Sequence, residues 1–245
     1  MERADLVQHT SKRFNADLEL VLKRALDMAR LAERQFQDAF KALVAADAPL
    51  ASKVVQCDQQ INDMERDITA ECQRLFATRA PAAGDLRLLL ALIKMIGDVE
   101  RIGDECKKIA LVTLHLTNDP RQRGKFREIR HLARVVQQMV HSALDAFERL
   151  DADAALVVMR MDRAIDTEYE AIQRQCVTYM MEDPEMIRRA LDDMWTIRAL
   201  ERVGDHAKNL CEYVVYVVRG KDIRHALPHN VDMALERTPE QTASP

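Results

Sequence analysis

The chain has 245 residues, with 36 basic and 40 acidic side chains mixed along it, so its net charge of −4 gives no electrostatic footprint for binding nucleic acid. Aromatic residues make up only 4% of the composition, which leaves few platforms for stacking on bases. Six glycines and seven prolines are few for this length, and with 48% hydrophobic residues they favour long helices around a buried core, so we expect an all-α protein.

Several further classes of protein are excluded by the cysteines and by the N-terminus. The five cysteines form no Cys-x-x-Cys pair and are odd in number, so neither a zinc knuckle nor a disulfide framework is indicated. The charged start, residues 1–5, is unlike a signal peptide, and no run of about 18 apolar residues could span a membrane. No Ser-His-Asp set or glycine-rich phosphate loop is recognisable. We therefore expect a cytoplasmic protein that is not an enzyme.

Three long helices are predicted in the first half of the chain. Apolar residues of the first helix are spaced alternately four and three, as in a helical bundle. Asp47-Ala48-Pro49 ends this helix and offers Asp47 as the cap of the next one. The predicted helices cover about residues 10–46, 49–76 and 85–116. The seam of the first helix comprises Leu18, Leu22, Ala25, Ala29, Ala32, Phe36, Ala39, Leu43 and Ala46.

The second half of the chain repeats the first. Asn118-Asp119-Pro120 is the main loop signal and divides the chain near its middle. In the second half, Asp151-Ala152-Asp153 is equivalent to the helix break at Asp47-Ala48-Pro49. Equivalent residues of the second helices differ by 104 in residue number, and those of the third helices by 101. The difference in length therefore falls in the turn between the second and third helices, as expected for a true duplication. We predict an all-α fold of two tandem three-helix bundles with six long helices. The predicted domains are a first repeat at 1–119, a second repeat at 120–225 and a poorly ordered tail at 226–245.

One short acidic motif recurs at the same place in both repeats. Glu100-Arg101-Ile102-Gly103-Asp104 returns as Glu201-Arg202-Val203-Gly204-Asp205, so each copy has a Glu and an Asp four residues apart. On a helix both carboxylates project from one face and repel each other unless a cation offsets them. In the first copy they continue an apolar seam that includes Leu86, Leu90 and Leu111, where a charge needs a partner. The glycine between them lets the backbone of a neighbouring helix approach closely.

The second helix of each repeat supplies a matching polar pair at the same spacing. Antiparallel packing can bring this pair opposite the acidic motif, which gives up to four oxygen-bearing side chains in one place. Oxygen ligands suit hard cations such as Mg²⁺, Mn²⁺ or Ca²⁺, and carboxylate clusters also hold iron, so we predict bound metal ions, with Mg, Mn or Fe as candidates. The predicted ligands are Asp58, Asn62, Glu100 and Asp104 in the first repeat and Asp162, Asp166, Glu201 and Asp205 in the second.

Two other interpretations of these acids remain open. Lysines that follow each motif, such as Lys107 and Lys208, could pair with the acids and leave only a salt-bridged surface. A ferritin-like carboxylate metal enzyme or metal store would normally use Glu-x-x-His. Here the position of that imidazole is a glycine, and His206 points about 100° away from the neighbouring Asp205, so we do not expect it to be a metal ligand.

Three methionines cluster at the junction between the second and third helices of the second repeat. Met180, Met181 and Met186 surround Asp183-Pro184. Methionine fills irregular gaps, so we interpret these residues as part of the core, with an adaptable partner surface as the alternative.

Taken together, these residues resemble the PhoU family, the phosphate-transport accessory and regulatory proteins of bacteria. Both copies of Glu-Arg-(Ile/Val)-Gly-Asp match the acid-x-x-x-Asp signature of that family, and residues 9–16 are similar to its start. Residues 178–184 and 220–225 are similar to those of the enterobacterial type. The resemblance covers about residues 9–225.

The resemblance implies a cytoplasmic homodimer of helical bundles with metal bound at the acidic motifs. It also implies two partners, the ATPase subunit of a Pst-type phosphate ABC transporter and a phosphate-sensing histidine kinase, so that the membrane is reached only peripherally. Through them such a protein restrains phosphate uptake and represses the phosphate-starvation response, the Pho regulon. Asn62 departs from the acid at Asp166, and we expect weaker metal retention in the first repeat.

Overall fold

The computed structural model describes residues 12–79, 81, 83–117 and 127–223, and these residues form helices and turns without a strand. The prediction of an all-α fold is confirmed. None of the helices in these ranges is long and apolar enough to cross a membrane. In chain order the elements are α1 (Lys12–Ala45), α2 (Ala48–Arg79), α3 (Ala83–Thr117), α4 (Arg127–Arg149), α5 (Ala152–Met159), α6 (Asp162–Glu182), the 3₁₀ turn η3 (Pro184–Met186) and α7 (Ile187–Arg219).

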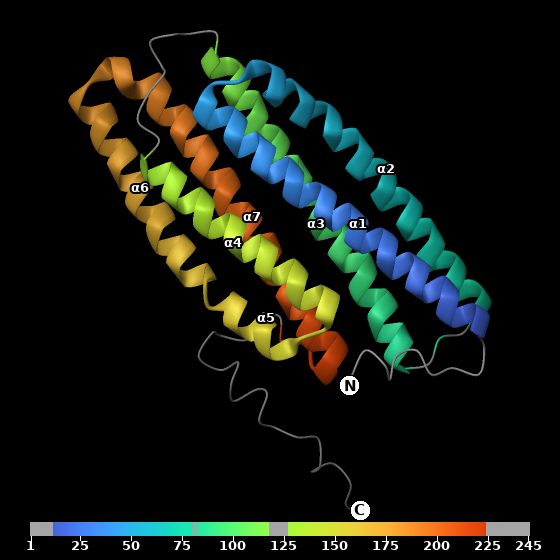
Figure 1. The fold of residues 1–245 in the computed structure, drawn as a ribbon. Coiled ribbons are helices and arrows are strands. Elements are labelled where there is room, and N and C mark those ends of the chain that lie inside the picture. The colour runs from blue at the N-terminus through green and yellow to red at the C-terminus, as the bar shows by residue number, and fades with distance from the viewer. Residues whose placement is uncertain (1–11, 80, 82, 118–126, 224–245) are drawn as a thin grey trace, which may run out of the picture.

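The helices form two bundles that pack side by side, as the internal repeat predicts. Figure 1 shows α1, α2 and α3 together on one side and α4, α6 and α7 on the other, with α3 and α7 side by side between them. The second repeat differs in one respect, because a turn at Arg160 and Met161 divides its second helix into α5 and α6. Two tandem three-helix bundles with six long helical segments are therefore confirmed.

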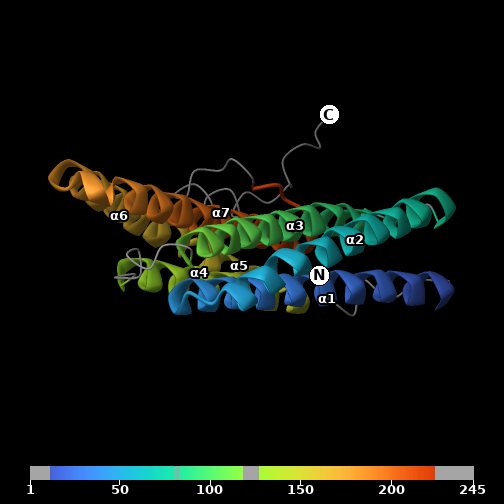
Figure 2. The same ribbon diagram turned by 90° about the horizontal axis from the view of Figure 1, so that it is seen from above.

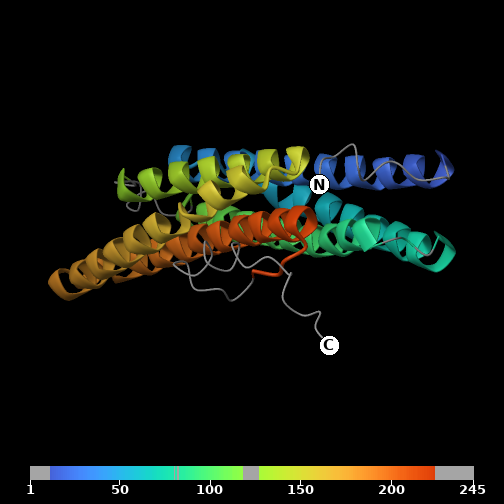
Figure 3. The ribbon, with the colours of Figure 1, turned by 90° about the horizontal axis from the view of Figure 1, so that it is seen from below.

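The two bundles together make two layers. Figures 2 and 3 show α6, α7, α3 and α2 in one layer, with α1 and α4 in the other. Both ends of the four-helix layer curve away from α1 and α4, so its outer face is concave. The acidic motifs of α3 and α7 lie on this concave face.

The core follows the predicted seams of α1 and α4. Every predicted seam residue of α1 is buried except Ala46, which has a left-handed φ of 50° at the end of the helix. Leu150 occupies the equivalent position after α4 with a φ of 51°. Asp47 Oδ1 then accepts from the Leu50 amide at 2.9 Å, and Asp151 Oδ1 from the Ala154 amide at 2.9 Å. The duplication therefore extends to the turn and cap after each first helix.

Glycine ends the last helix, as its position predicts. Gly220 has a left-handed φ of 67°, and its amide donates to the Tyr216 carbonyl at 2.9 Å. The predicted tail at 226–245 and the predicted loop at 118–120 lie outside the described residues.

Burial contradicts the prediction that the acidic motif of α3 lies in a core seam. Leu86, Leu90 and Leu111 on that seam are 40%, 38% and 50% exposed. α3 is apolar on two faces, and the face that packs inward is the neighbouring stripe of Leu89, Leu92, Ile96, Val99, Cys106 and Ala110. The seam with the acids therefore lies on the outer, concave face, because α1 and α2 cover the opposite stripe. Met181 and Met186 are likewise exposed rather than core residues, at 82% and 37%.

Removing the cap at Asp151 tests this account of the turns. We expect Asp151→Ala to lower the free energy of unfolding by about 1 kcal/mol, because the Ala154 amide loses its acceptor. Asp151→Asn keeps a capping oxygen and should stay within a few tenths of a kcal/mol of the natural protein. Urea unfolding followed by circular dichroism measures both, and equal losses in the two variants would contradict the capping role.

Candidate functional site

The first acidic cluster lies between α2 and α3. Asp58 of α2 is 2% exposed, and its Oδ2 accepts from Lys107 Nζ of α3 at 2.7 Å. Burial, followed by the negative charges of Asp104, Glu65 and Asp58, raises the pKa of Glu100 above its ordinary value. These acids are therefore close enough to repel one another, and a single lysine on α3 is paired within the cluster.

The second acidic cluster repeats this arrangement between α6 and α7. Lys208 Nζ of α7 donates to Asp162 Oδ2 of α6 at 2.5 Å. Loss of hydration, followed by the charges of Asp162 and Asp166, raises the pKa of Asp205. The pKa of Glu201 is raised by burial and then by Asp205, and that of Asp166 by burial and then by Asp162. All four predicted residues of this repeat therefore form one electrostatic cluster.

The position of the lysines bears on the salt-bridge interpretation. Lys107 and Lys208 each follow their motif aspartate by three residues, yet each reaches across to the neighbouring helix instead of pairing along its own. This arrangement leaves the motif acids with little neutralisation, since Glu201 has only Arg198 at 3.5 Å. Over the described part of the chain, Glu100 and Asp104 have no cation within 4.0 Å. Each cluster thus holds more negative charge than its lysine offsets.

Glu65 completes the first cluster and was not among the predicted ligands. It lies two turns after Asp58 on α2 and contributes to the raised pKa of Glu100. The signal was available, because Glu65 interrupts the apolar seam of its helix at the same helical face as Asp58. The equivalent residue of the second repeat is Tyr169. With Glu65 the first cluster also has four carboxylates and one lysine, while Glu170 adds to the negative charge around Asp166 in the second. Weaker metal retention in the first repeat therefore stays a prediction.

The oxygen atoms present fit a hard cation in chemical type. Asp58 Oδ1 and Asn62 Oδ1 are buried, and within the residues described neither has a hydrogen-bond partner. At the same time, the described residues contain no group of three or more His, Cys, Asp or Glu side chains positioned to hold a metal ion. The acids are gathered but do not converge on one point, and Asp58 and Asp162 are each paired with a lysine. Metal binding therefore stays a prediction.

Close packing beside both clusters depends on the glycines of the motifs. A Cβ at Gly103 would lie 3.2 Å from both Gln35 Oε1 and Ile61 Cδ1, and one at Gly204 would lie 3.2 Å from Ile165 Cδ1. Each isoleucine belongs to the helix that supplies the partner acids. The predicted close approach at these glycines is found, but the approaching atoms belong to side chains and not to the backbone of the neighbouring helix.

A buried polar network joins the two cluster-bearing helices. Asp98 of α3 is 2% exposed and accepts from His206 Nδ1 at 2.8 Å, from Tyr213 Oη at 2.6 Å and from Asn209 Nδ2 at 3.2 Å, all on α7. Burial acts to raise the pKa of Asp98, but these hydrogen bonds outweigh it and the pKa is lowered. His206 therefore belongs to the buried contact between α3 and α7. Nearby, Arg202 Nε of α7 lies 2.7 Å from Glu105 Oε1 of α3.

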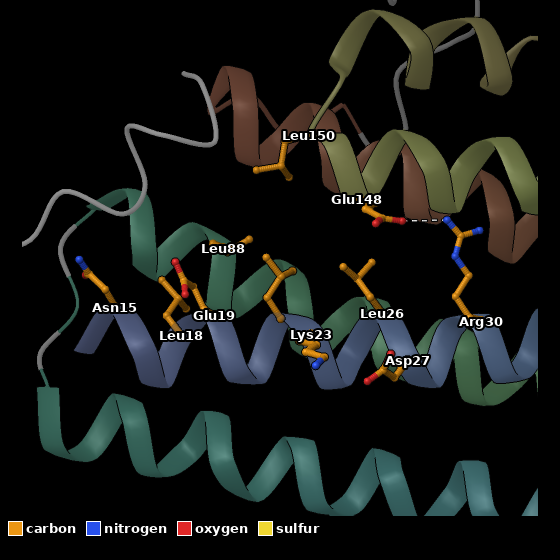
Figure 4. Close-up of a pocket in the computed structure, with 11 residues that line it drawn as sticks. Asn15, Leu18, Glu19, Lys23, Leu26, Asp27, Arg30, Leu88, Glu148 and Leu150 are labelled. Atoms are coloured by element: carbon orange, nitrogen blue, oxygen red, sulfur yellow. Dashed lines mark hydrogen bonds and ion pairs between the residues drawn. The ribbon is translucent and has the colours of Figure 1, made fainter. Parts of the chain in front are cut away.

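A separate hollow of about 600 Å³ lies between α1, the start of α3 and the end of α4 (Figure 4). Leucines such as Leu18 and Leu88 line it together with charged residues, and Arg30 Nη2 there is already bonded to Glu148 at 2.8 Å. The hollow contains none of the predicted metal ligands. The two acidic clusters are therefore the candidate functional site.

Comparison with known proteins identifies relatives over nearly the whole chain. Residues 25–113 and 129–214 each match the PhoU domain. The chain is 48% identical over 225 residues to the phosphate-specific transport system accessory protein PhoU homolog of Pseudomonas aeruginosa, covering 92% of this chain and 93% of that protein. It is 39% identical over 235 residues to the phosphate-specific transport system accessory protein PhoU of Escherichia coli K12, covering 96% and 97%.

Two solved structures share the fold. The crystal structure of PhoU from Pseudomonas aeruginosa is similar with a TM-score of 0.83 at 49% identity, covering 85% of this chain and 100% of that one. The phosphate transport system regulatory protein PhoU from Streptococcus pneumoniae is similar with a TM-score of 0.79 at 27% identity, covering 85% and 98%.

Charge crowding in the clusters makes a stability prediction for the metal-free protein. Because the folded protein raises the pKa of Glu201, it favours the protonated side chain. The folded state is therefore favoured below the ordinary glutamate pKa, and this preference is lost as pH rises through the raised pKa. We therefore expect Glu201→Gln to raise the free energy of unfolding at neutral pH by about 0.5 kcal/mol, through loss of repulsion from Asp205, and to give no gain in acid.

Urea unfolding in EDTA at about pH 7.5 and about pH 3.5, on either side of the carboxylate range, measures this difference. Glu19→Gln on α1 is the matched control, because Glu19 is exposed and lies on a helix that carries neither cluster. A gain that is equal at both pH values, or equal in the control, would contradict the crowding argument.

Proposed function

The chain belongs to the PhoU family, and we propose from this membership and from its paired acidic clusters that it is a metal-binding accessory regulator of phosphate transport. In this proposal it restrains phosphate uptake by a Pst-type ABC transporter and represses the phosphate-starvation response. The observation that carries the proposal is the repetition of one acidic cluster, lysine included, on the exposed concave face of both repeats. The printed names of the relatives support the link to phosphate transport.

The proposed partners are the ATPase subunit of the transporter and a phosphate-sensing histidine kinase, with a homodimer as the working assembly. A cytoplasmic location fits both partners. The long concave layer of α6, α7, α3 and α2 offers a surface large enough for such contacts. The metal would act there by neutralising the acids and by fixing α2 against α3 and α6 against α7.

The residues proposed to hold metal are those of the two clusters. Asp58, Asn62, Glu100 and Asp104 would serve the first repeat, with Glu65 beside them, and Asp162, Asp166, Glu201 and Asp205 the second. Mg²⁺, Mn²⁺ and iron all suit such oxygen-rich ligands. In the metal-free protein Lys107 pairs with Asp58 and Lys208 pairs with Asp162. A bound metal ion would displace these lysines from the two aspartates.

The alternative function is a ferritin-like carboxylate metal enzyme or metal store. It is less well supported because neither cluster contains a histidine. His206, which follows Asp205 in the chain, already donates a hydrogen bond from Nδ1 to Asp98. The relatives are also named as accessory and regulatory proteins.

Metal binding predicts a stability change that needs no assay of activity. We expect Mn²⁺ at about 100 times its Kd to raise the free energy of unfolding by about 2.7 kcal/mol relative to EDTA. Lys208→Met should bind Mn²⁺ more tightly, because the cation no longer competes with Nζ for Asp162. The double variant Glu201→Gln/Asp205→Asn should lose binding at the second cluster only. Thermal unfolding and elemental analysis measure these outcomes, and protein that neither retains nor responds to metal would support the salt-bridge interpretation.

The regulatory role predicts a change of phosphate uptake in cells. In cells that lack their own copy, Glu100→Gln/Glu201→Gln should fail to restrain uptake, with several-fold higher phosphate accumulation and an active starvation reporter in phosphate-rich medium. Glu19→Gln/Glu148→Gln is the matched control, with the same charge change on α1 and α4, which carry neither cluster. Normal uptake in the first variant together with redox turnover of bound iron in the natural protein would favour the ferritin-like alternative.

A further inference from the structure

Large apolar side chains lie exposed at one end of the concave face. Six of them form what we call the apolar strip: Leu111 of α3, Val177 and Met181 of α6, and Ile187, Leu191 and Trp195 of α7. Trp195 is the only tryptophan of the chain and is 67% exposed, and Met181 is 82% exposed. Single exposed apolar residues are normal, but six neighbouring ones on a single face indicate a binding surface.

Helical spacing and the register of the ion pairs place these residues together. Ile187, Leu191 and Trp195 are each four residues apart and share one face of α7. The pair of Asp162 with Lys208 sets α6 antiparallel to α7, which puts Val177 level with Leu191.

Two pairs set α3 antiparallel to α7 in the same way. They join Glu105 to Arg202 and His115 to Asp192, and their register puts Leu111 level with Trp195. The apolar strip therefore crosses three adjacent helices of the four-helix layer (Figure 2).

The first repeat acts as an internal control for the apolar strip. At the equivalent positions it has Gln73 for Val177, Ala77 for Met181 and Lys94 for Trp195. The equivalent of Leu111 is Glu212. Leu86 and Leu90 are the large apolar matches, at the positions of Ile187 and Leu191. Since the first repeat forms the same helices with Gln73, Ala77 and Lys94 in place of Val177, Met181 and Trp195, the fold does not require these three side chains, and a ligand is the better explanation.

Negative charge lies at both ends of the apolar strip. At the outer end Glu182, Asp183 and Glu185 are exposed, with Arg188 as the nearby cation. At the inner end lies the second acidic cluster, and Arg198 between them is already near Glu201 at 3.5 Å. From Ile187 to Asp205 the helix is about 27 Å long, which matches a helix of about 18 residues.

We propose that the apolar strip docks an amphipathic helix of a partner protein whose apolar face carries basic residues at both ends. Its apolar residues would cover Trp195 and Leu191, and its basic ends would meet the acids at either end of the strip. A second copy of this chain is disfavoured, because two-fold pairing through the strip would bring acids against acids. An anionic membrane is disfavoured for the same reason. This inference goes beyond the proposed function and concerns the metal-free protein, because bound metal would neutralise the acids at the inner end of the strip.

The experiment uses the full chain in EDTA and a synthetic 18-residue amphipathic peptide with a leucine-rich face and lysines at both ends, a length that follows from the helical rise of about 1.5 Å per residue. We expect saturable binding with a blue shift of Trp195 fluorescence. For variants, anisotropy of a labelled peptide replaces the tryptophan signal. Trp195→Lys, which installs the first-repeat residue, should weaken binding by about tenfold or more, as for an interface hot spot. Leu191→Ala should weaken it clearly, whereas its first-repeat match Leu90→Ala should stay within about twofold of the natural protein.

Several results would overturn the proposal. The first is that the peptide does not bind saturably. The second is that a peptide with glutamates at its ends, or with its leucines scattered around the helix, binds as well as the designed one. The third is that Leu191→Ala and Leu90→Ala weaken binding equally. Sedimentation equilibrium in which Trp195→Lys converts a dimer to a monomer would assign the strip to a second copy instead. A Trp195 blue shift with phosphatidylglycerol vesicles but not with the peptide would assign it to a membrane.

Discussion

The antiparallel contact between α3 and α7 is the constraint on which the rest of the structure depends. Each of these helices carries one acidic motif on its outer face, and residues next to the motifs pair across the interface. Arg202, beside Glu201, meets Glu105, beside Asp104, at 2.7 Å. Asp98 gathers three donors from α7 and stays ionised although it is buried. The two clusters are therefore held at fixed places on one rigid layer.

This interface is less symmetric than the repeat that contains it. Glu105 in the first repeat corresponds to His206 in the second, and Asp98 corresponds to Ala199. The duplication thus kept the outer acids of both helices and changed the residues that join them. Buried charges of this kind are costly unless fully paired, and they favour one register over its alternatives, since a one-turn slip would leave Asp98 without donors.

The acidic clusters lower the stability of the metal-free protein, and the proposed function explains this cost by cation binding. Burial and then mutual repulsion raise the pKa of these carboxylates, and one lysine per cluster offsets only part of the repulsion. A fold selected for stability alone would replace some of these acids with neutral residues. Their repetition, with the glycine that lets a neighbouring side chain approach, is what favours a cation-dependent regulator over a salt-bridged surface.

Sequence alone determined the helices, the duplication and the pairing of acids, because these depend on local spacing. The caps at Asp47 and Asp151, the glycine at Gly220 and the grouping of Asp162, Asp166, Glu201 and Asp205 all follow from periodicity and offsets. Only the tertiary structure decided which apolar stripe of α3 packs inward, since both stripes have helical spacing. It also decided that Lys107 and Lys208 cross to the neighbouring helix, that Glu65 joins the first cluster and that Trp195 is exposed. These features depend on which helix lies beside which, and local spacing carries no information about that.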